Sequence, residues 1–293
     1  MRTLLLLLLP SGRALRPPGG GLVRRRIGMP PCATMTSAAE GSAADKPPDQ
    51  DGFLIKNSHN KVALLKCPTR QVLQQGILET ADLPHICIAG ESNAGKSSLI
   101  NHLLSKKSLA RASSVAGKTR SIDMMLVNER VVVTDLPGLP SRDGQVTQMW
   151  ETQWEPLVFD YVRNCDRLLG MLYVHDVRWK VSSLVREFVQ EVRDSGLPVM
   201  LVLTKDDRLA NELREPSPAA EHELRQRHMK RVRRSLGFEG VHVHYSTSSE
   251  LAVSRKARRR LLRFVESMVA AGSREDCAVL LDEVAKKSYT DLW

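Results

Sequence analysis

One short stretch constrains this chain of 293 residues more than any other. Residues 90–97 read Gly-Glu-Ser-Asn-Ala-Gly-Lys-Ser, between the apolar run 86–89 and a helix-forming run that starts at Ser98. In a strand-loop-helix setting, G-x-x-x-x-G-K-S turns backbone N–H groups toward a phosphate, brings its lysine to the terminal phosphates and offers its serine hydroxyl to Mg²⁺. This stretch, called the P-loop below, predicts nucleotide binding; the simpler alternative is a glycine-rich surface turn.

The chain from residue 53 onward alternates apolar runs with helix-forming runs. This order predicts an α/β fold, a mostly parallel sheet of six strands with helices on both faces. Asn128 and Glu129 alone separate the second and third strands, so we expect a hairpin that gives the sheet one antiparallel edge. The expected strands are 85–89, 121–127, 130–134, 168–174, 198–203 and 241–245, and the expected helices are 96–104, 148–164, 182–194, 221–235 and 254–271.

The loops after the strands are where ligands bind in such a sheet. Asp135 begins an Asp-Leu-Pro-Gly run after the third strand. A carboxylate there can hold Mg²⁺ through water, and Gly138 can offer its N–H to the terminal phosphate. Thr119, in the loop 106–120, can add a second hydroxyl to the Mg²⁺ only when a γ-phosphate is present.

Two further loops indicate that the base is guanine. After the fifth strand the chain reads Thr204-Lys205-Asp206-Asp207. The Asp207 carboxylate can accept hydrogen bonds from N1–H and the exocyclic amine of guanine, a pattern that adenine lacks, while the Lys205 stem packs on the base. Residues 246–248 can close the base pocket, although serine-rich loops are common.

The predicted site residues fall into three overlapping groups. The catalytic group is Lys96, Thr119 and Gly138, and the magnesium ligands are Ser97, Thr119 and Asp135. The nucleotide-binding group is Glu91, Ser92, Asn93, Ala94, Gly95, Lys96, Ser97, Ser98, Asp135, Gly138, Thr204, Lys205, Asp207, Ser246, Thr247 and Ser248. Together they predict a switch GTPase that binds GTP or GDP with Mg²⁺.

These motifs resemble the EngB family of P-loop GTPases. The likeness runs from Asp82 to Ala271, and residues 90–101 are similar to the family's G-R-S-N-V-G-K-S-S-L-I-N. Further matches are Gly117-Lys118-Thr119, Asp135-Leu136-Pro137-Gly138, Asp176 with Arg178, and Leu203-Thr204-Lys205-x-Asp207. The resemblance implies a Ras-like fold and a GTPase that helps to assemble the large ribosomal subunit. The chain departs from the family at Glu91, Ala94 and Leu139-Pro140-Ser141, where the family has Arg, Val and Tyr-Gly-Tyr.

Hydrolysis is expected to be slow without help. Many switch GTPases have a Gln after the Asp-x-x-Gly glycine to orient the attacking water, and this chain has Leu139. In GTPases similar to the family, an Asn at the position of Asn93 coordinates K⁺; alternatively, Asn93 only shapes the loop. A GTP-binding scaffold without hydrolysis also remains open.

The amino terminus has the composition of a transit peptide. Residues 1–39 contain six arginines and no acidic residue, whereas the apolar run 4–9 is short for a secretory signal and ends at Pro10. We expect a mitochondrial matrix protein, with a plastid as the alternative. The predicted parts are a transit peptide (1–39), a linker and N-terminal extension (40–80), a G domain (81–271) and a helical tail (272–293).

The charge of the chain favours a polyanionic partner. The net charge is +10, and no run approaches the roughly 18 apolar residues of a membrane span, so no stable membrane insertion is expected. We expect a monomer when free, with large-subunit ribosomal RNA and assembly intermediates as partners; a membrane- or division-linked GTPase is the alternative. Two basic clusters would contact RNA: Arg225, Arg227, Lys230, Arg231, Arg233 and Arg234, and Arg255, Lys256, Arg258, Arg259, Arg260 and Arg263.

Overall fold

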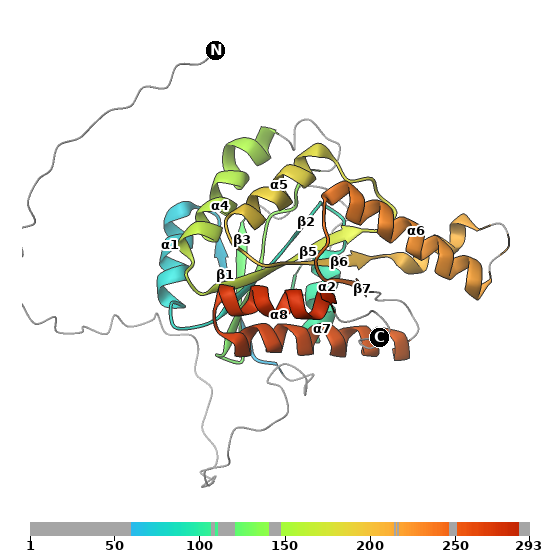
Figure 1. Ribbon diagram of the computed structural model, residues 1–293. Coiled ribbons are helices and arrows are strands. Elements are labelled where there is room, and N and C mark those ends of the chain that lie inside the picture. The colour runs from blue at the N-terminus through green and yellow to red at the C-terminus, as the bar shows by residue number, and fades with distance from the viewer. Residues whose placement is uncertain are drawn as a thin grey trace, which may run out of the picture. The chain divides into compact units, whose positions relative to one another are not determined.

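The computed structural model describes residues 60–106, 109–110, 121–140, 148–213, 215, 217–245 and 251–286. Within these residues the chain forms a seven-stranded sheet in the order β1-β3-β4-β2-β5-β6-β7 (Figure 1). Its strands are β1 (Val62–Cys67), β2 (His85–Gly90), β3 (Ile122–Val127), β4 (Val131–Asp135), β5 (Leu168–Asp176), β6 (Val199–Thr204) and β7 (His242–Tyr245). Neighbours from β4 to β7 pair in parallel, so the mostly parallel α/β sheet is confirmed.

The prediction of six strands was wrong, because β1 was missed. This strand lies in the segment taken as a linker and N-terminal extension, and it pairs antiparallel with β3 from Val62–Val127 to Cys67–Ile122. Most of its side chains are partly or fully exposed, as at Leu64, and such an edge strand lacks the continuous apolar run that marks a buried one. The β-sheet therefore begins well before residue 81.

The hairpin between β3 and β4 is confirmed. Asn128 and Glu129 have φ values of 51° and 56°, as a two-residue turn with the twist of a hairpin requires. The antiparallel edge is wider than predicted, since β1 and not β3 forms the border. Asn128 connects the hairpin to the residues just before β1. Its Oδ1 accepts from the Lys61 N–H at 2.9 Å, and its Nδ2 donates to Asn60 Oδ1 at 3.0 Å.

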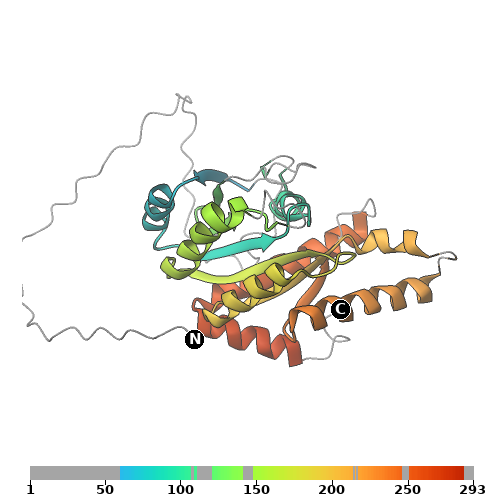
Figure 2. The same cartoon turned by 90° about the horizontal axis from the view of Figure 1, so that it is seen from above.

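Helices cover both faces of the sheet, as predicted (Figures 1 and 2). One core contains side chains of α1 (Arg70–Glu79), α4 (Glu155–Asn164), α5 (Ser183–Asp194) and α6 (Pro218–Leu236). The other contains side chains of α2 (Lys96–Leu103), α7 (Leu251–Ala271) and α8 (Arg274–Lys286). None of the helices in the described part is long and apolar enough to cross a bilayer.

Two short helical segments interrupt this pattern. A π-helical turn, η1 (Trp150–Trp154), precedes α4, and a 3₁₀ segment, η2 (Asp206–Glu212), follows β6. Trp150 is fully buried against Phe188, with ring centroids 5.8 Å apart, and Trp154 is 4% exposed. These tryptophans are therefore core residues that fix the start of α4.

Candidate nucleotide-binding site

The parallel strands end at one edge of the sheet, and the predicted site residues lie there. Gly90 ends β2, Asp135 ends β4 and Thr204 ends β6. The P-loop leaves β2 at Gly90 and runs into α2 at Lys96. Loops from three strands that are separate in sequence thus meet around the P-loop.

The backbone of the P-loop requires its glycines. Gly90 has φ +148°, and a Cβ there would lie 2.1 Å from the Val174 carbonyl oxygen. Gly95 has φ +107° at the start of α2, and Asn93 adopts a left-handed φ of 65°. The first helical hydrogen bond runs from Leu99 N–H to Gly95 C=O, so the N–H groups of residues 96–98 precede the first helical acceptor. Such an end suits an anion.

The side chain of Lys96 folds back over the start of the P-loop. Its Nζ donates to the carbonyl oxygens of Gly90 at 2.9 Å and Glu91 at 3.1 Å, and the residue is 7% exposed. Burial lowers the pKa of the Lys96 ammonium, and the nearby Asp135 and Glu91 carboxylates oppose that shift. The ammonium is therefore already beside the place where a terminal phosphate would add negative charge.

Asp135 fits the role of a residue that holds a divalent cation. It is 3% exposed, and its Oδ1 is buried without a hydrogen-bond partner. Burial raises the pKa of Asp135 to about 7, although the Lys96 ammonium opposes that shift. A hard oxygen ligand in this state gains from a cation such as Mg²⁺. Ser97, the second predicted ligand in the described residues, is half-buried in the first turn of α2.

The segment after β4 pairs with the P-loop through its backbone. The Leu139 N–H donates to Gly90 O at 3.1 Å, and the Ser92 N–H donates to Leu139 O at 2.9 Å. Gly138 lies close to the P-loop: an added Cβ would come within 2.7 Å of Ser92 Oγ and 3.1 Å of Lys96 Nζ. Any larger residue at position 138 would require Ser92 and Lys96 to shift, and Leu139 itself is fully buried.

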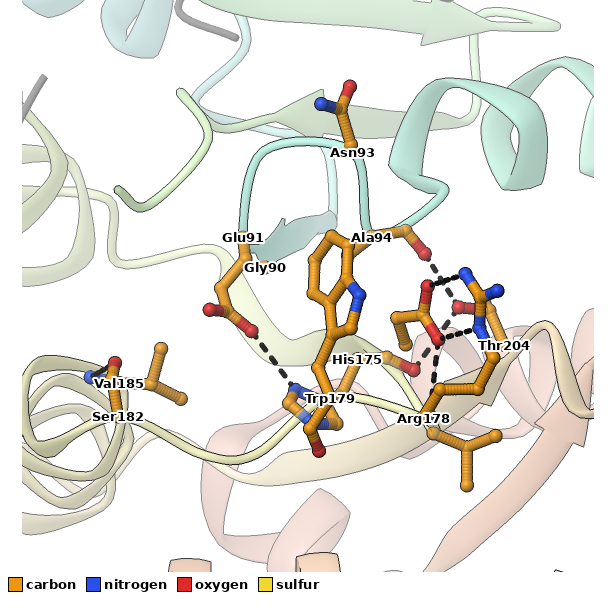
Figure 3. Close-up of polar contacts among 12 residues, drawn as sticks. Gly90, Glu91, Asn93, Ala94, His175, Arg178, Trp179, Ser182, Val185 and Thr204 are labelled. Atoms are coloured by element: carbon orange, nitrogen blue, oxygen red, sulfur yellow. Dashed lines mark hydrogen bonds and ion pairs between the residues drawn. The ribbon is translucent and has the colours of Figure 1, made fainter. Parts of the chain in front are cut away.

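The predicted base-binding loop holds the P-loop from the other side. Thr204 Oγ1 donates to Ala94 O at 2.6 Å and to His175 O at 3.1 Å (Figure 3). Lys205 Nζ donates to Asn93 O at 2.6 Å. Lys205 Nζ also lies 3.2 Å from Asp176 Oδ2 and 5.3 Å from the centre of the Trp179 ring. Asp207 is exposed in the 3₁₀ segment η2, where a ligand can reach it.

Asp176 is the buried anchor of this loop. Arg178 contacts both of its carboxylate oxygens, with Nε at 2.9 Å and Nη2 at 2.7 Å. Burial would raise the pKa of Asp176, but the hydrogen bonds from Arg178 and the charge of Lys205 outweigh it and hold that pKa below its usual value. The matched residues Asp176 and Arg178 therefore position Lys205.

A buried pair beneath the P-loop was not predicted. The Glu91 side chain turns away from the loop, and its Oε2 lies 3.3 Å from His175 Nδ1, with both side chains at most 3% exposed (Figure 3). His175 Nε2 lies 3.4 Å from the Trp179 carbonyl oxygen. Glu91 can therefore serve a nucleotide only through its backbone. The replacement of the family's Arg by Glu91 was the one sequence signal, but nothing in the sequence identified His175 as its partner.

Four predicted site residues cannot be placed. Thr119 and residues 246–248 lie outside the described residues, so their roles stay predictions. Ser98 is exposed on the first turn of α2, and Asn93 is exposed at the tip of the loop, with its side chain directed away from the contacts below it (Figure 3).

Some arginines of the two basic clusters form hydrogen bonds inside the protein, and the contact of the clusters with RNA stays a prediction. Arg231 Nη2 donates to the Val177 and Arg178 carbonyls at 3.0 and 3.1 Å, and Arg258 Nε donates to His102 O at 2.8 Å. Arg233 likewise donates to carbonyls just beyond its own helix. Arginine's several donors suit helix ends and loop carbonyls, which spacing alone cannot reveal.

Comparison with known proteins identifies the family. A family model described as a 50S ribosome-binding GTPase matches residues 85–205. A probable GTP-binding protein EngB of Alkaliphilus metalliredigens (strain QYMF) is 35% identical over 156 residues, 53% of this chain and 69% of that protein. Another, of Syntrophomonas wolfei subsp. wolfei, is 30% identical over 175 residues, 59% of this chain and 82% of that protein. The chain belongs to the EngB family.

Membership in the EngB family fits the geometry at the sheet edge. The solved structure of a probable GTP-binding protein engB aligns with 20% identity and a TM-score of 0.45, over 64% of this chain and 98% of that one. The chain described here, as a member of the EngB family, binds GTP and is a GTP-hydrolysing enzyme. Its P-loop, Asp135 and the Thr204–Asp207 loop lie at the carboxyl ends of β2, β4 and β6.

Proposed function

We propose that this GTPase acts as a switch in the assembly of the large subunit of a mitochondrial ribosome. The observation that carries the proposal is the match of residues 85–205 to a family of 50S ribosome-binding GTPases. The arginine-rich, acid-free segment 1–39 supports an organelle, with the mitochondrial matrix preferred to a plastid. The ribosome concerned would then be the organelle's own.

The residues of the sheet edge would divide the work of binding. Lys96 and the N–H groups at the start of α2 would bind the terminal phosphates, and Asp207 would accept hydrogen bonds from guanine. Asp135 and Ser97 would hold Mg²⁺, with Thr119 as a further ligand. When bound, Mg²⁺ neutralises charge on the phosphates during transfer. Gly138 would offer its N–H to the γ-phosphate.

The site residues described above include no obvious group that would orient the attacking water for hydrolysis. Leu139 has no hydrogen-bonding side chain and is fully buried, so we expect slow intrinsic hydrolysis. Asn93 is exposed at the tip of the P-loop and would hold K⁺ if the enzyme uses it. Turnover measured in KCl and in NaCl tests this role, and equal rates would leave Asn93 as a residue that only shapes the loop.

The proposed partner is large-subunit ribosomal RNA in an assembly intermediate. The net charge of +10 and the exposed basic residues of α6 and α7 support a polyanionic partner, and phosphate contacts of this kind weaken as salt rises. The test is co-sedimentation with mitochondrial large-subunit particles in a GTP analogue and in GDP. We expect binding that depends on the nucleotide and on salt; co-sedimentation that neither changes would contradict the proposal.

A scaffold that binds GTP without using its hydrolysis predicts a different result. Single-turnover phosphate release, measured with and without large-subunit particles, separates the two functions. A switch releases phosphate and the particles accelerate the release, because the particle supplies what Leu139 lacks. Release at one slow rate under every condition would favour the scaffold.

A further inference from the structure

The amino-terminal half of α7 carries a concentration of basic residues. Residues 251–263 include six arginines and lysines and no acidic residue; Glu266 is the first acid of the helix. Arg255, Arg259 and Arg263 are exposed and follow one another at intervals of four residues, which places them on one face. This face therefore attracts anions along a line.

Arg258 lies beside this line and is only partly satisfied. Its Nε donates to the carbonyl oxygens of His102 at 2.8 Å and Leu103 at 3.1 Å, where α2 ends. These bonds fix the guanidinium in position. Its Nη2 is buried and has no hydrogen-bond partner. A buried guanidinium donor without an acceptor is costly, so an acceptor arriving here would be favoured.

A small cavity opens between these arginines. It has a volume of about 230 Å³, and its described lining residues are Arg255, Arg258, Arg259 and Leu262. Three arginines thus line one cavity, and no acidic side chain is among the described lining residues. A planar guanidinium matches the oxygens of a phosphate in a bidentate way, which a lysine cannot do.

We propose that this cavity, the α7 pocket, is a binding site for a backbone phosphate of RNA. Arg255 and Arg259 contact the phosphate at the mouth, and Arg258 donates to it from the wall. The inference rests on the proposed function in one respect, that the RNA is ribosomal. Helix α7 packs with α2 and α8 on one face of the sheet, opposite to α6 (Figure 1), so the pocket belongs to that side.

A phosphate of RNA fits this surface better than an anionic membrane. A helix that lies on a membrane exposes large apolar side chains beside its basic ones. In the described residues the exposed large apolar side chains are Leu64, Val72, Leu78 and Val279, and none of them is on α7. Leu261 and Leu262 are buried. From Arg255 onward, where its side chains are described, α7 therefore has no exposed large apolar residue beside its arginines.

Helix α6 provides the matched control. Its exposed basic residues include Arg227, Lys230 and Arg234, but Glu221 and Glu223 lie on the same helix, and Arg225 pairs with Glu221 at 3.3 Å. Removing two exposed arginines from α6 changes the net charge as much as removing two from the α7 pocket. Arg234 also lines a cavity, but Glu187, Glu191 and Asp194 line that cavity too, so it does not gather positive charge as the α7 pocket does.

The experiment compares the full-length chain with R255Q/R259Q and R227Q/R234Q. A labelled single-stranded RNA oligonucleotide is titrated over a range of KCl concentrations. We expect R255Q/R259Q to lose about tenfold in affinity and its salt slope to fall by about 1.4, since each lost phosphate contact removes about 0.7. R227Q/R234Q should lose less than about twofold. GTP affinity should not change in either variant, because neither pair contacts the P-loop.

Equal losses in the two variants would overturn the pocket, because the charge of the whole molecule would then suffice. Inorganic phosphate and anionic phosphatidylglycerol vesicles identify the source of the phosphate. If R255Q/R259Q loses stabilisation by inorganic phosphate or binding to vesicles, but keeps its RNA affinity and salt slope, RNA is the wrong ligand. Unchanged binding of all three probes also overturns the pocket.

The same proteins separate the pocket from the proposed function. If the unmodified chain fails to co-sediment with large-subunit particles while R255Q/R259Q still loses RNA affinity, the ribosomal role fails and the pocket stands. If the unmodified chain and R255Q/R259Q both co-sediment with the same salt dependence, the pocket fails and the ribosomal role stands.

Discussion

The P-loop is held on two flanks that are built in different ways. On the β4 flank, residues 135–139, the contacts are between backbones: Leu136 N–H donates to Ile88 O at 3.0 Å, and Leu139 bonds Gly90 and Ser92. On the β6 flank, residues 204–205, the contacts come from side chains, with Thr204 and Lys205 each donating to a P-loop carbonyl at 2.6 Å. The contacts of the β4 flank depend on the path of the backbone, and those of the β6 flank depend on the side chains of Thr204 and Lys205.

The two flanks also differ in how their charges are balanced. Beside the β6 flank, Lys205 and Arg178 neutralise the charge of Asp176, so no charge there needs a ligand to balance it. Asp135 on the β4 flank keeps a buried oxygen without a partner. Binding of a cation and a phosphate therefore changes the free energy of the β4 flank most. We therefore expect the response to GTP to lie on the β4 flank, where Asp135 is not yet balanced.

The largest expected effect comes from Gly138→Ala. The new Cβ would lie 2.7 Å from Ser92 Oγ and 3.1 Å from Lys96 Nζ, so the side chains of Ser92 and Lys96 would have to shift. We expect GTP hydrolysis to fall about 100-fold, because small displacements of reacting groups cost that much, while GDP affinity changes little. Steady-state turnover and GDP titration measure the two.

Gly196→Ala is the control for Gly138→Ala. Gly196 has φ +78° and no atom within 4 Å of an added Cβ, so alanine there costs about 1 kcal/mol of backbone strain and nothing at the site. Its hydrolysis rate should match the unmodified enzyme. Equal loss of activity in both variants would mean that the effect of Gly138→Ala is a loss of stability and not of geometry.

Asp135→Asn should stabilise the nucleotide-free protein while impairing the enzyme. The pKa of Asp135 is raised by burial from 3.8 to about 7, so ionisation favours the unfolded chain as pH rises through this range. The gain from Asn should be small near pH 4 and reach up to about 4 kcal/mol above pH 7, at about 1.4 kcal/mol for each pKa unit. Urea unfolding at pH 5 and pH 8 measures it.

The same variant should lose the benefit of Mg²⁺. We expect the gain in GTP affinity that Mg²⁺ gives to shrink about 10- to 100-fold, as for other residues that hold a metal through water. Asp123→Asn is the control, since Asp123 faces Asp135 across the β3–β4 pair but is not a predicted ligand. An Asp135→Asn protein with no gain in stability at pH 8 would show that the buried carboxylate is already balanced.

Local patterns predicted the parts of the molecule that the backbone path determines. The P-loop and the Asp135–Gly138 run follow apolar strands directly, so chain order alone brings them to one edge of the sheet. The hairpin at Asn128 and Glu129 is equally local. The strand β1 was missed because an exposed edge strand has little apolar periodicity, and its partner β3 lies 55 or more residues away in the sequence.

The contacts that hold the P-loop from below could not be read from the sequence. Glu91 and His175 are 84 positions apart, and the pair exists only because β5 lies beside β2 in the sheet. The arginines of α6 and α7 illustrate the same limit. Their spacing indicated shared faces, but whether Arg231 or Arg258 points to water or to a carbonyl depends on which loop packs against the helix.

A smaller effect is expected from Thr204→Val on the β6 flank. The change keeps the shape of the side chain but leaves the Ala94 and His175 carbonyls without their shared donor, at a cost of about 1–3 kcal/mol in the free energy of unfolding. Because Ala94 belongs to the P-loop, GTP and GDP affinity should both fall, by about tenfold. Nucleotide titration and urea unfolding measure the two effects.

Thr134→Val is the matched control for Thr204→Val. Thr134 is fully buried on β4, and its Oγ1 lies 2.8 Å from the Tyr161 hydroxyl, away from the P-loop. It should lose a similar amount of stability and keep its nucleotide affinity. If both threonine variants bind nucleotide equally well, the β6 flank holds the P-loop without help from this hydroxyl.

The smallest change in rate is expected from Leu139→Gln, although it restores the residue that many switch GTPases use to orient water. Leu139 is fully buried, and its backbone is bonded to Gly90 and Ser92, so the new amide would enter the core and not the site. We expect turnover within about twofold and a loss of about 1–3 kcal/mol in the free energy of unfolding. Leu136→Gln, at a side chain that is 1% exposed on the same flank, should behave alike.

If Leu139→Gln alone accelerates hydrolysis tenfold or more, residue 139 must leave the core when GTP binds. The backbone pairing of the β4 flank would then be a contact that GTP breaks, and the flank would respond by detaching from the P-loop.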